Sequence, residues 1–157
     1  MEKSNMSDIK KFFPPAAFFF SVIINGDDSG ADAYFQEVSG LEMELEVEDV
    51  VEGGQNGFKH RLPTRAKYNN LILKRGLILE GSNMLSWCQN TIQKVFQKAI
   101  ELKSIAVQLQ DSAGNPLMTW NFNNAYPIKW KVSDFNAEEN AIVIENLEFA
   151  YRDFSVS

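Results

Sequence analysis

Four carboxylates occupy every second position from Glu42 to Glu48 in the stretch LEMELEVE. Carboxylates gathered in a row can ligate cations or exchange protons. On a β-strand, however, successive side chains on one face lie about 6.6 Å apart, because each residue rises about 3.3 Å. That spacing is too wide for neighbouring carboxylates to close on one ion. The alternation therefore predicts a charged strand face rather than a metal site, and it predicts a buried opposite face made of Leu41, Met43, Leu45 and Val47.

Few other residues offer catalytic chemistry. The chain has one histidine, His60, one cysteine, Cys88, and none of the G-x-S-x-G, Walker or GxGxxG patterns. His60 stands among basic residues, which favours a surface or interface role over a catalytic one. Cys88 falls on the apolar side of a predicted helix, which favours a buried thiol over a nucleophile. The sequence therefore predicts a protein that is not an enzyme and needs no cofactor or metal.

The charges are segregated along the chain. Residues 37–52 contain seven acids and no Lys or Arg, and residues 59–75 contain six bases and no acid. A hairpin across the loop GGQNG (53–57) would bring the two segments together. One register places Glu48 opposite Arg61, Glu44 opposite Arg65 and Glu42 opposite Lys67, with Lys59, Arg61, Arg65 and Lys67 on one strand face. Either this charge-paired hairpin or a solvated acidic face fits the pattern.

Hydrophobic periodicity predicts the remaining elements. A period of two, bounded by turn residues, indicates strands, and a period of 3.6 after Ser82 indicates one amphipathic helix over 83–101, capped by Ser82 or Asn83. DSAGNP (111–116) predicts a turn. The fold class is mainly β with one flanking helix. The expected strands are 17–25, 34–38, 41–51, 58–68, 70–79, 104–111, two short strands within 117–135 with Pro127 at an edge or bulge, and 141–154.

Length and composition favour a single domain over residues 17–157, preceded by a flexible arm over 1–16. The apolar run FFPPAAFFFSVII imitates a signal peptide, but Pro14 and Pro15 interrupt it and no suitable cleavage site follows. The run is also too short to span a membrane. We therefore expect no signal peptide and no membrane insertion.

The net charge of −6 argues against non-specific nucleic-acid binding, which needs a basic surface. Trp120, Tyr126 and Trp130 could form a base-stacking or sugar-binding platform. Their neighbours lack the clustered positive charge that nucleic acid requires, so core or interface packing is the better interpretation.

Four phrases of the sequence resemble the tube proteins of contractile phage tails and bacterial injection systems. FQEVSGLEMELEVEDVVEGG is followed by LPTRAKYNNLILKRG, in which residues 67–76 match the pattern K-x-x-x-[IL]-x-[LF]-K-R-G. TWNFNNAYPIKW (119–130) and IENLEFAYRDF (144–154) resemble the closing strands of the same family. The phrases occur in the family's order and cover nearly the whole chain.

The resemblance implies a β-barrel-like tail-tube fold of two packed antiparallel sheets, without enzymatic activity. Such subunits form hexameric rings that stack into a hollow tube, inside a sheath, and cargo travels in the lumen. The resemblance implies a lumen-facing set of Glu42, Glu44, Glu46, Glu48, Arg65 and Lys67. It also implies a ring-stacking loop of Gly53, Gly54, Gln55, Asn56, Gly57, Phe58, Lys59, His60 and Arg61.

The implied partners are other copies of the chain, a sheath protein, baseplate or spike proteins, tube-terminating proteins and the cargo. Assembly is expected in the bacterial cytoplasm, within a phage tail or a phage-tail-like particle. Two alternatives stay open. One is a baseplate-proximal paralogue that initiates the tube on the spike or hub. The other is a monomeric β-barrel that binds a small molecule in an apolar internal cavity.

Overall fold

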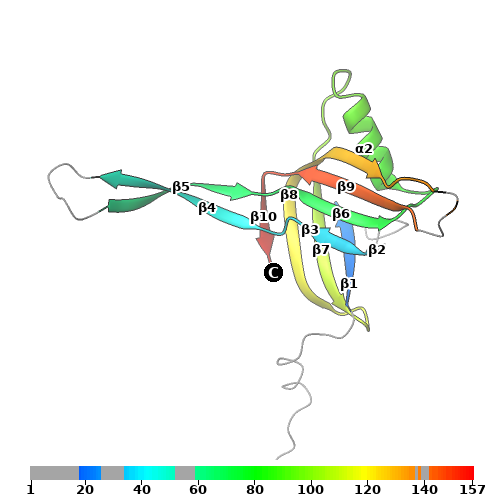
Figure 1. Ribbon diagram of the computed structural model, residues 1–157, viewed down its shortest axis with the longest axis horizontal. Helices are drawn as coiled ribbons and strands as arrows, with labels where there is room; N and C mark the ends of the chain where they lie inside the picture. The colour runs from blue at the N-terminus through cyan, green and yellow to red at the C-terminus, as the bar shows by residue number, and fades with distance from the viewer. Residues whose placement is uncertain (1–17, 26–33, 52–58, 137, 139–141) are drawn as a thin grey trace, which may run out of the picture.

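The computed structural model describes residues 18–25, 34–51, 59–136, 138 and 142–157, so the expected N-terminal arm lies outside the described residues. Within them the chain is mainly β with one helix, as predicted (Figure 1). The elements are β1 (Phe18–Ile24), β2 (Tyr34–Phe35), β3 (Glu37–Ser39), β4 (Met43–Val51), β5 (Lys59–Tyr68), β6 (Leu71–Gly76), α2 (Asn83–Gln93), β7 (Lys103–Asp111), β8 (Pro116–Val132), β9 (Ile144–Ala150) and β10 (Asp153–Val156).

Two antiparallel sheets share the long strand β8. Its first half pairs with β7 and β10, and its second half pairs with β9. The strand order β2-β1-β7-β8-β9-β6-β3 therefore runs from one sheet into the other. β2 and β3 are separated by Gln36 alone, whose backbone N–H donates to the carbonyl of Lys74 at 2.9 Å. This short crossing, predicted as a return strand over 34–38, links the two outer strands and gives the body its barrel-like form.

The prediction of two short strands within 117–135 is wrong, because β8 is continuous over 17 residues. β8 bends instead of breaking: Asn124 has a φ of 52°, and the register with β9 shifts between Pro127 and Lys129. The expected bulge at Pro127 is thereby confirmed. The single strand predicted over 141–154 is also wrong. It divides at Tyr151 and Arg152, because β9 and β10 pair with the two differently directed halves of β8.

The helix begins where the sequence predicts and ends earlier. Ser82 is its N-cap, and the Ser82 hydroxyl accepts a hydrogen bond from the backbone N–H of Leu85 at 3.0 Å. The predicted end at residue 101 is wrong, since α2 stops at Gln93. Phe96 is fully exposed and Val95 and Ile100 are 40% and 41% exposed, so the apolar pattern beyond Gln93 is not buried against the described part of the chain. The buried helix residues are Met84, Trp87, Cys88 and Thr91.

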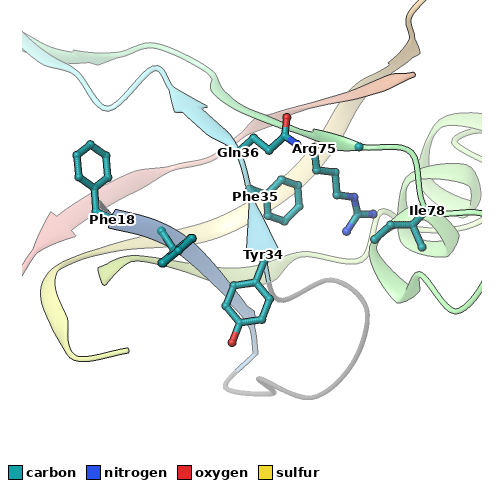
Figure 2. Close-up of a pocket in the computed structure, with 8 residues that line it drawn as sticks. Phe18, Tyr34, Phe35, Gln36, Arg75 and Ile78 are labelled. Carbon is teal, nitrogen blue, oxygen red and sulfur yellow. The ribbon is translucent and has the colours of Figure 1, made fainter. Parts of the chain in front are cut away.

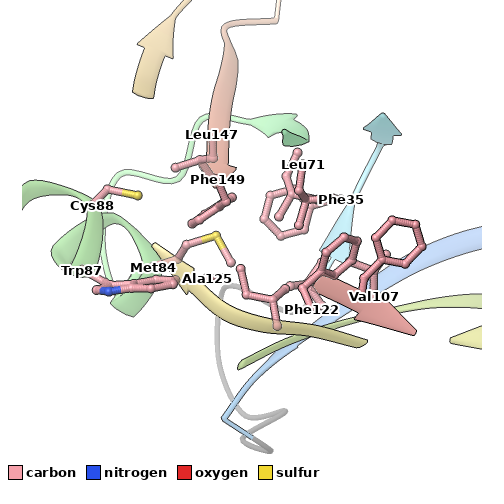
Figure 3. Close-up of a cluster of buried hydrophobic side chains, with 14 residues drawn as sticks. Phe35, Leu71, Met84, Trp87, Cys88, Val107, Phe122, Ala125, Leu147 and Phe149 are labelled. Atoms are coloured by element: carbon pink, nitrogen blue, oxygen red, sulfur yellow. The ribbon is translucent and has the colours of Figure 1, made fainter. Parts of the chain in front are cut away.

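The core fills the space between the sheets and under α2 (Figure 3). Trp87 of the helix stacks on Phe149 of β9, with ring centroids 5.5 Å apart, and the thiol of Cys88 is buried as expected. Phe122 has no exposed surface. The buried hydrophobic residues are Val22, Phe35, Leu71, Leu73, Met84, Trp87, Cys88, Ile105, Val107, Phe122, Ala125, Leu147, Phe149 and Phe154.

A charged pair lies inside this core. Arg75 of β6 donates through Nε to Oε2 of Glu145 on β9 at 2.8 Å, and these side chains are 3% and 0% exposed. Trp130 Nε1 donates to the other carboxylate oxygen at 2.7 Å. Arg75 also donates to the helix-capping hydroxyl of Ser82 at 2.9 Å, and its guanidinium lies 4.9 Å from the ring centroid of Phe35. The network joins strands β2, β6, β8 and β9 to the start of α2.

Gly40 lies between β3 and β4, where the chain passes close to the backbone of Asn70. It has a φ of +84°, and an added Cβ would lie 1.9 Å from the carbonyl oxygen of Asn70. Gly81 has a similar φ of +81°, but nothing lies within 4 Å of an added Cβ there. The two glycines therefore share a backbone conformation and differ in the space available.

Gly40→Ala and Gly81→Ala form a matched pair for chemical denaturation. We expect Gly81→Ala to lower the free energy of unfolding by about 1 kcal/mol, the cost of a left-handed conformation. Gly40→Ala should cost at least about 2 kcal/mol more, because the backbone of Asn70 must move. Equal costs for the two substitutions would contradict the proposed steric role of Gly40.

Arg75→Met removes the cationic partner of a carboxylate that is fully buried. We expect it to lower the free energy of unfolding by about 3–5 kcal/mol, because Glu145 is left charged in the core. Combining Arg75→Met with Glu145→Met should recover much of that loss. Additive losses in the double variant would show that the two side chains are not coupled.

Candidate assembly interface

β4 and β5 form a separate two-stranded sheet that projects from the body as a long hairpin (Figure 1). Of the nine residues in β4, all but Glu46 are exposed. A two-stranded hairpin is at best marginally stable in water without a surface to pack on. The hairpin contains most of the residues that the sequence singled out.

The base of the hairpin is held by aromatic residues of the body. The ring centroid of Tyr68 lies 5.9 Å from that of Tyr151 and 5.5 Å from that of Phe154. The Tyr151 hydroxyl donates to the carbonyl of Asn69 at 2.5 Å. The pKa of Tyr151 is raised to about 12, mainly by burial and to a lesser extent by the nearby Tyr68 and Glu42. The hydroxyl therefore stays protonated at neutral pH.

The hairpin exists as predicted, but the predicted register is wrong. Lys67 lies opposite Glu44 instead of Glu42, and Arg65 lies opposite Glu46 instead of Glu44. Glu48 faces Leu62, and Arg61 faces Asp49. Glu42 lies just before β4. The opposite charges of the two strands do meet, as the charge-paired interpretation required, but with partners displaced along the strand.

A β-bulge accounts for part of the displacement: the strands pair one residue out of the predicted register on the tip side of the bulge and two residues out on the base side. The register shifts between Glu46 and Val47, and Thr64 is the extra residue on β5, with its hydroxyl donating to the carbonyl of Glu46 at 3.1 Å. An extra residue reverses the alternation of faces in the strand that contains it. The expectation that Lys59, Arg61, Arg65 and Lys67 share one face is therefore wrong. Arg61 lies on the face of Asp49, opposite to the face of Arg65 and Lys67.

Glu46 and Arg65 form a two-pronged ion pair, in which Arg65 Nε and the terminal guanidinium nitrogen donate to the two carboxylate oxygens. The hydrogen bond from Arg65 lowers the pKa of Glu46, and the same bond raises the pKa of Arg65. Arg61 and Asp49 lie 3.6 Å apart on the other face. The acidic row is thus partly neutralised within the hairpin.

Of the apolar residues expected to be buried, Leu41, just before β4, packs partly against the core, whereas the apolar residues of β4 itself are exposed in the single chain. Met43, Leu45 and Val47 are 56%, 58% and 43% exposed, and Leu62 of β5 is 51% exposed. The body cannot cover them, because the hairpin points away from it (Figure 1). These residues were missed as interface candidates, although their strict alternation with glutamates already marked a two-faced strand.

The expected ring-stacking loop is only partly described. Gly53, Gly54, Gln55, Asn56, Gly57 and Phe58 lie outside the described residues. Lys59, His60 and Arg61 form the first part of β5, near the end of the hairpin that is farthest from the body. His60 is exposed, in agreement with a surface or interface role.

A second apolar surface lies on the body, where β1, β2 and β6 meet (Figure 2). It is a groove of about 480 Å³ with Phe35 and the buried Arg75 among its lining residues. Phe18, Phe19 and Tyr34 of its lining are 50%, 52% and 67% exposed. Over the described ranges no cluster of three or more metal-ligating side chains occurs, and no helix there is long and apolar enough to cross a membrane.

Comparisons with known proteins agree with this architecture. A chain from the sheath–tube complex of the PVC extracellular contractile injection system in its extended state is 25% identical, with a TM-score of 0.75 and 99% of both chains covered. A chain of the anti-feeding prophage baseplate is 26% identical, with a TM-score of 0.71 and 92% of this chain and 96% of that chain covered. Hcp1 from Flavobacterium johnsoniae, at 16% identity and a TM-score of 0.51, covers 88% of this chain and 94% of its own and shares the fold alone.

A search of curated proteins finds no match. Residues 16–155, nearly the whole chain, match the family described as T4-like virus tail tube protein gp19. The resemblance inferred from the sequence is thereby confirmed, as is the prediction that the protein is not an enzyme. This chain belongs to the T4-like tail tube protein family and is a structural protein of contractile tails and injection systems.

Proposed function

We propose that this chain is the main subunit of the inner tube of a contractile injection system or phage tail, that six copies close into a ring, and that rings stack into a tube whose lumen conducts cargo. The observation that carries the proposal is the projecting hairpin, whose apolar residues Met43, Leu45 and Val47 are exposed in the single subunit. Contacts with neighbouring copies would bury them, and a head-to-tail contact closes into a ring when its rotation allows.

The filled interior of the body argues against a monomeric barrel that binds a ligand in an internal cavity. Phe122, Phe149 and Leu71 are completely buried and fill the space between the sheets, where such a barrel would hold its ligand. The groove beside β1 lies at the surface and has half-exposed aromatic residues at its rim. That arrangement suits contact with another protein surface better than enclosure of a small molecule.

The baseplate-proximal tube initiator is the second candidate, and one observation favours it: a baseplate chain of the anti-feeding prophage is 26% identical. The chain of the PVC sheath–tube complex, however, matches over 99% of both chains with the higher TM-score. This fuller match favours the main tube subunit. The partners we propose are other copies, the sheath, the baseplate or spike, a tube-terminating protein and the cargo, with assembly in the bacterial cytoplasm before incorporation into the particle.

We further propose that Glu42, Glu44, Glu46, Glu48, Arg65 and Lys67 face the lumen and that residues 53–61 contact the adjacent ring. The pairing of Glu46 with Arg65 supports a lumen wall that is partly charge-compensated. Such a wall would bind neither acidic nor basic cargo strongly, because a charged molecule is attracted or repelled by a surface whose charges are all of one sign.

Leu45→Asp tests the role of the hairpin. We expect the population of rings in negative-stain images to fall at least about tenfold, because a charge is placed in a contact that excludes water. The melting temperature of the dispersed subunit should stay unchanged, since Leu45 is 58% exposed. The control is Phe96→Asp, which introduces the same charge at a fully exposed apolar residue outside the hairpin. Rings from Leu45→Asp in wild-type numbers would refute the proposed contact.

Arg65→Gln tests the charge pairing in the hairpin. The pKa of Glu46 lies below its ordinary value of 4.5 because Arg65 bonds its carboxylate. The stabilisation from this pair is therefore present above the ordinary pKa and is lost as pH falls through the lowered one. We expect Arg65→Gln to raise the pKa of Glu46. The measurement is the ¹³C chemical shift of the Glu46 carboxyl group as a function of pH. Arg61→Gln, which removes the partner of Asp49, should leave Glu46 unaffected. An unchanged Glu46 titration in Arg65→Gln would contradict the observed register.

A further inference from the structure

The second half of β8 presents an open strand edge. Over residues 126–132, β8 pairs with β9 on one side, and no described strand pairs with its other side. The four consecutive residues Ile128, Lys129, Trp130 and Lys131 are all exposed, although α2 also packs against β8. An open edge is a template for a strand from another chain.

Two lysines determine which strand this edge can accept. Lys129 and Lys131 stand two residues apart on one face of β8, opposite Glu148 and Asn146 of β9. In the part of the chain that the structure describes, neither lysine forms an ion pair within 4.0 Å. Lysines on an edge repel strands that carry like charge, so a partner strand must bring carboxylates at the matching spacing.

The outer edge of β4 brings such carboxylates. Glu44 and Glu48 are exposed on β4, and Glu42 is exposed just before the strand begins. Glu42 and Glu44 are two residues apart, as are Lys129 and Lys131, a separation of about 6.6 Å along an extended chain. Among the described residues none of these three carboxylates forms an ion pair, whereas Glu46 is already bound to Arg65. The unpaired charge on the β4 side of the hairpin is therefore negative, whereas on β5 Lys67, opposite Glu44, forms no ion pair among the described residues either.

We propose that the outer edge of β4 in one copy pairs with the open edge of β8 in the next copy, with Glu42 and Glu44 against Lys129 and Lys131. Within one chain this pairing is impossible, because the hairpin points away from the body (Figure 1). The occupant of the edge is therefore a second copy of this chain. The pairing extends a sheet from subunit to subunit and neutralises the acidic row across the contact.

The other combinations of edges are less favourable. Two β4 edges would oppose carboxylates, and two β8 edges would oppose lysines. β5 carries Arg65 and Lys67 beside its own open edge, so it would place basic residues against Lys129 and Lys131. Its arginines are also engaged already, Arg65 with Glu46 and Arg61 with Asp49. Of the two edges of the hairpin, charge thus favours β4 as the partner of β8.

This inference rests on the proposed ring assembly, and charge reversal in the full-length chain tests it. The first variant is Lys129→Glu with Lys131→Glu, the second is Glu42→Lys with Glu44→Lys, and the third combines all four changes. The matched control is Lys94→Glu with Lys98→Glu, the same change of net charge beyond the end of α2. Sedimentation velocity and negative-stain images give the fraction of protein in rings, and thermal melting of dispersed subunits verifies folding.

We expect each reversal pair alone to reduce the ring fraction at least about tenfold, because like charges then face each other across the contact. The combined variant should return to within about threefold of wild type, and the control should assemble normally. Normal assembly of the Lys129→Glu, Lys131→Glu variant would overturn the proposed strand pairing, and so would a combined variant that does not recover. In either case, rings formed by the wild type would still support the proposed function. Absence of rings from the wild type would refute both.

Discussion

Arg75 and Glu145 are the buried charges on which the body depends, because each polar atom of the pair that leaves water must find a partner inside the protein. The carboxylate receives Arg75 on one oxygen and Trp130 on the other. The same arginine reaches Ser82, the residue that caps α2, and lies against Phe35 at the crossing between the sheets. Sheet, helix and crossing are thus fixed to one another by a single connected network.

The rigid body explains how the hairpin can project. The aromatic group of Tyr68, Tyr151 and Phe154 holds the base of the hairpin, and Gly40 lets the chain cross Asn70 on its way into β4. Beyond that base the hairpin has no support from its own chain. Glu46 and Asp49 pair internally with Arg65 and Arg61, but the apolar residues of the hairpin stay exposed, so the hairpin would gain most from contacts with another molecule. The body is thus well packed, whereas the hairpin leaves apolar side chains exposed.

Local signals in the sequence predicted the parts of the fold that depend on neighbouring residues. Ser82 caps the helix, the side chain of Asp111 accepts from Ala113 and Asn115 in the predicted turn, and the alternation of residues 41–51 forms a strand. The end of α2 was missed, because the apolar period continues past Gln93 without a Gly or Pro to stop it. Whether that period is buried depends on distant surfaces that sequence periodicity does not describe.

The candidate site shows the same division. Opposite charge in residues 37–52 and 59–75 predicted the hairpin but not its register, which is one residue out on the tip side and a second residue out on the base side, where the extra residue Thr64 adds to the shift. Pro63 was the available hint, since proline in a sheet favours edges and bulges. The network of Arg75 and Glu145 left no signal of its own, because a charged residue in a strand is usually expected at the surface.

We propose that this chain is a subunit of a closed ring rather than an independent domain. Cryo-electron microscopy of the purified full-length chain at increasing concentration, with rotational averages of the end-on views, tests this proposal. We expect six-fold rings with an open lumen and, at higher concentration, stacks of such rings. A population that stays monomeric at every concentration, or closes with a different symmetry, would contradict it.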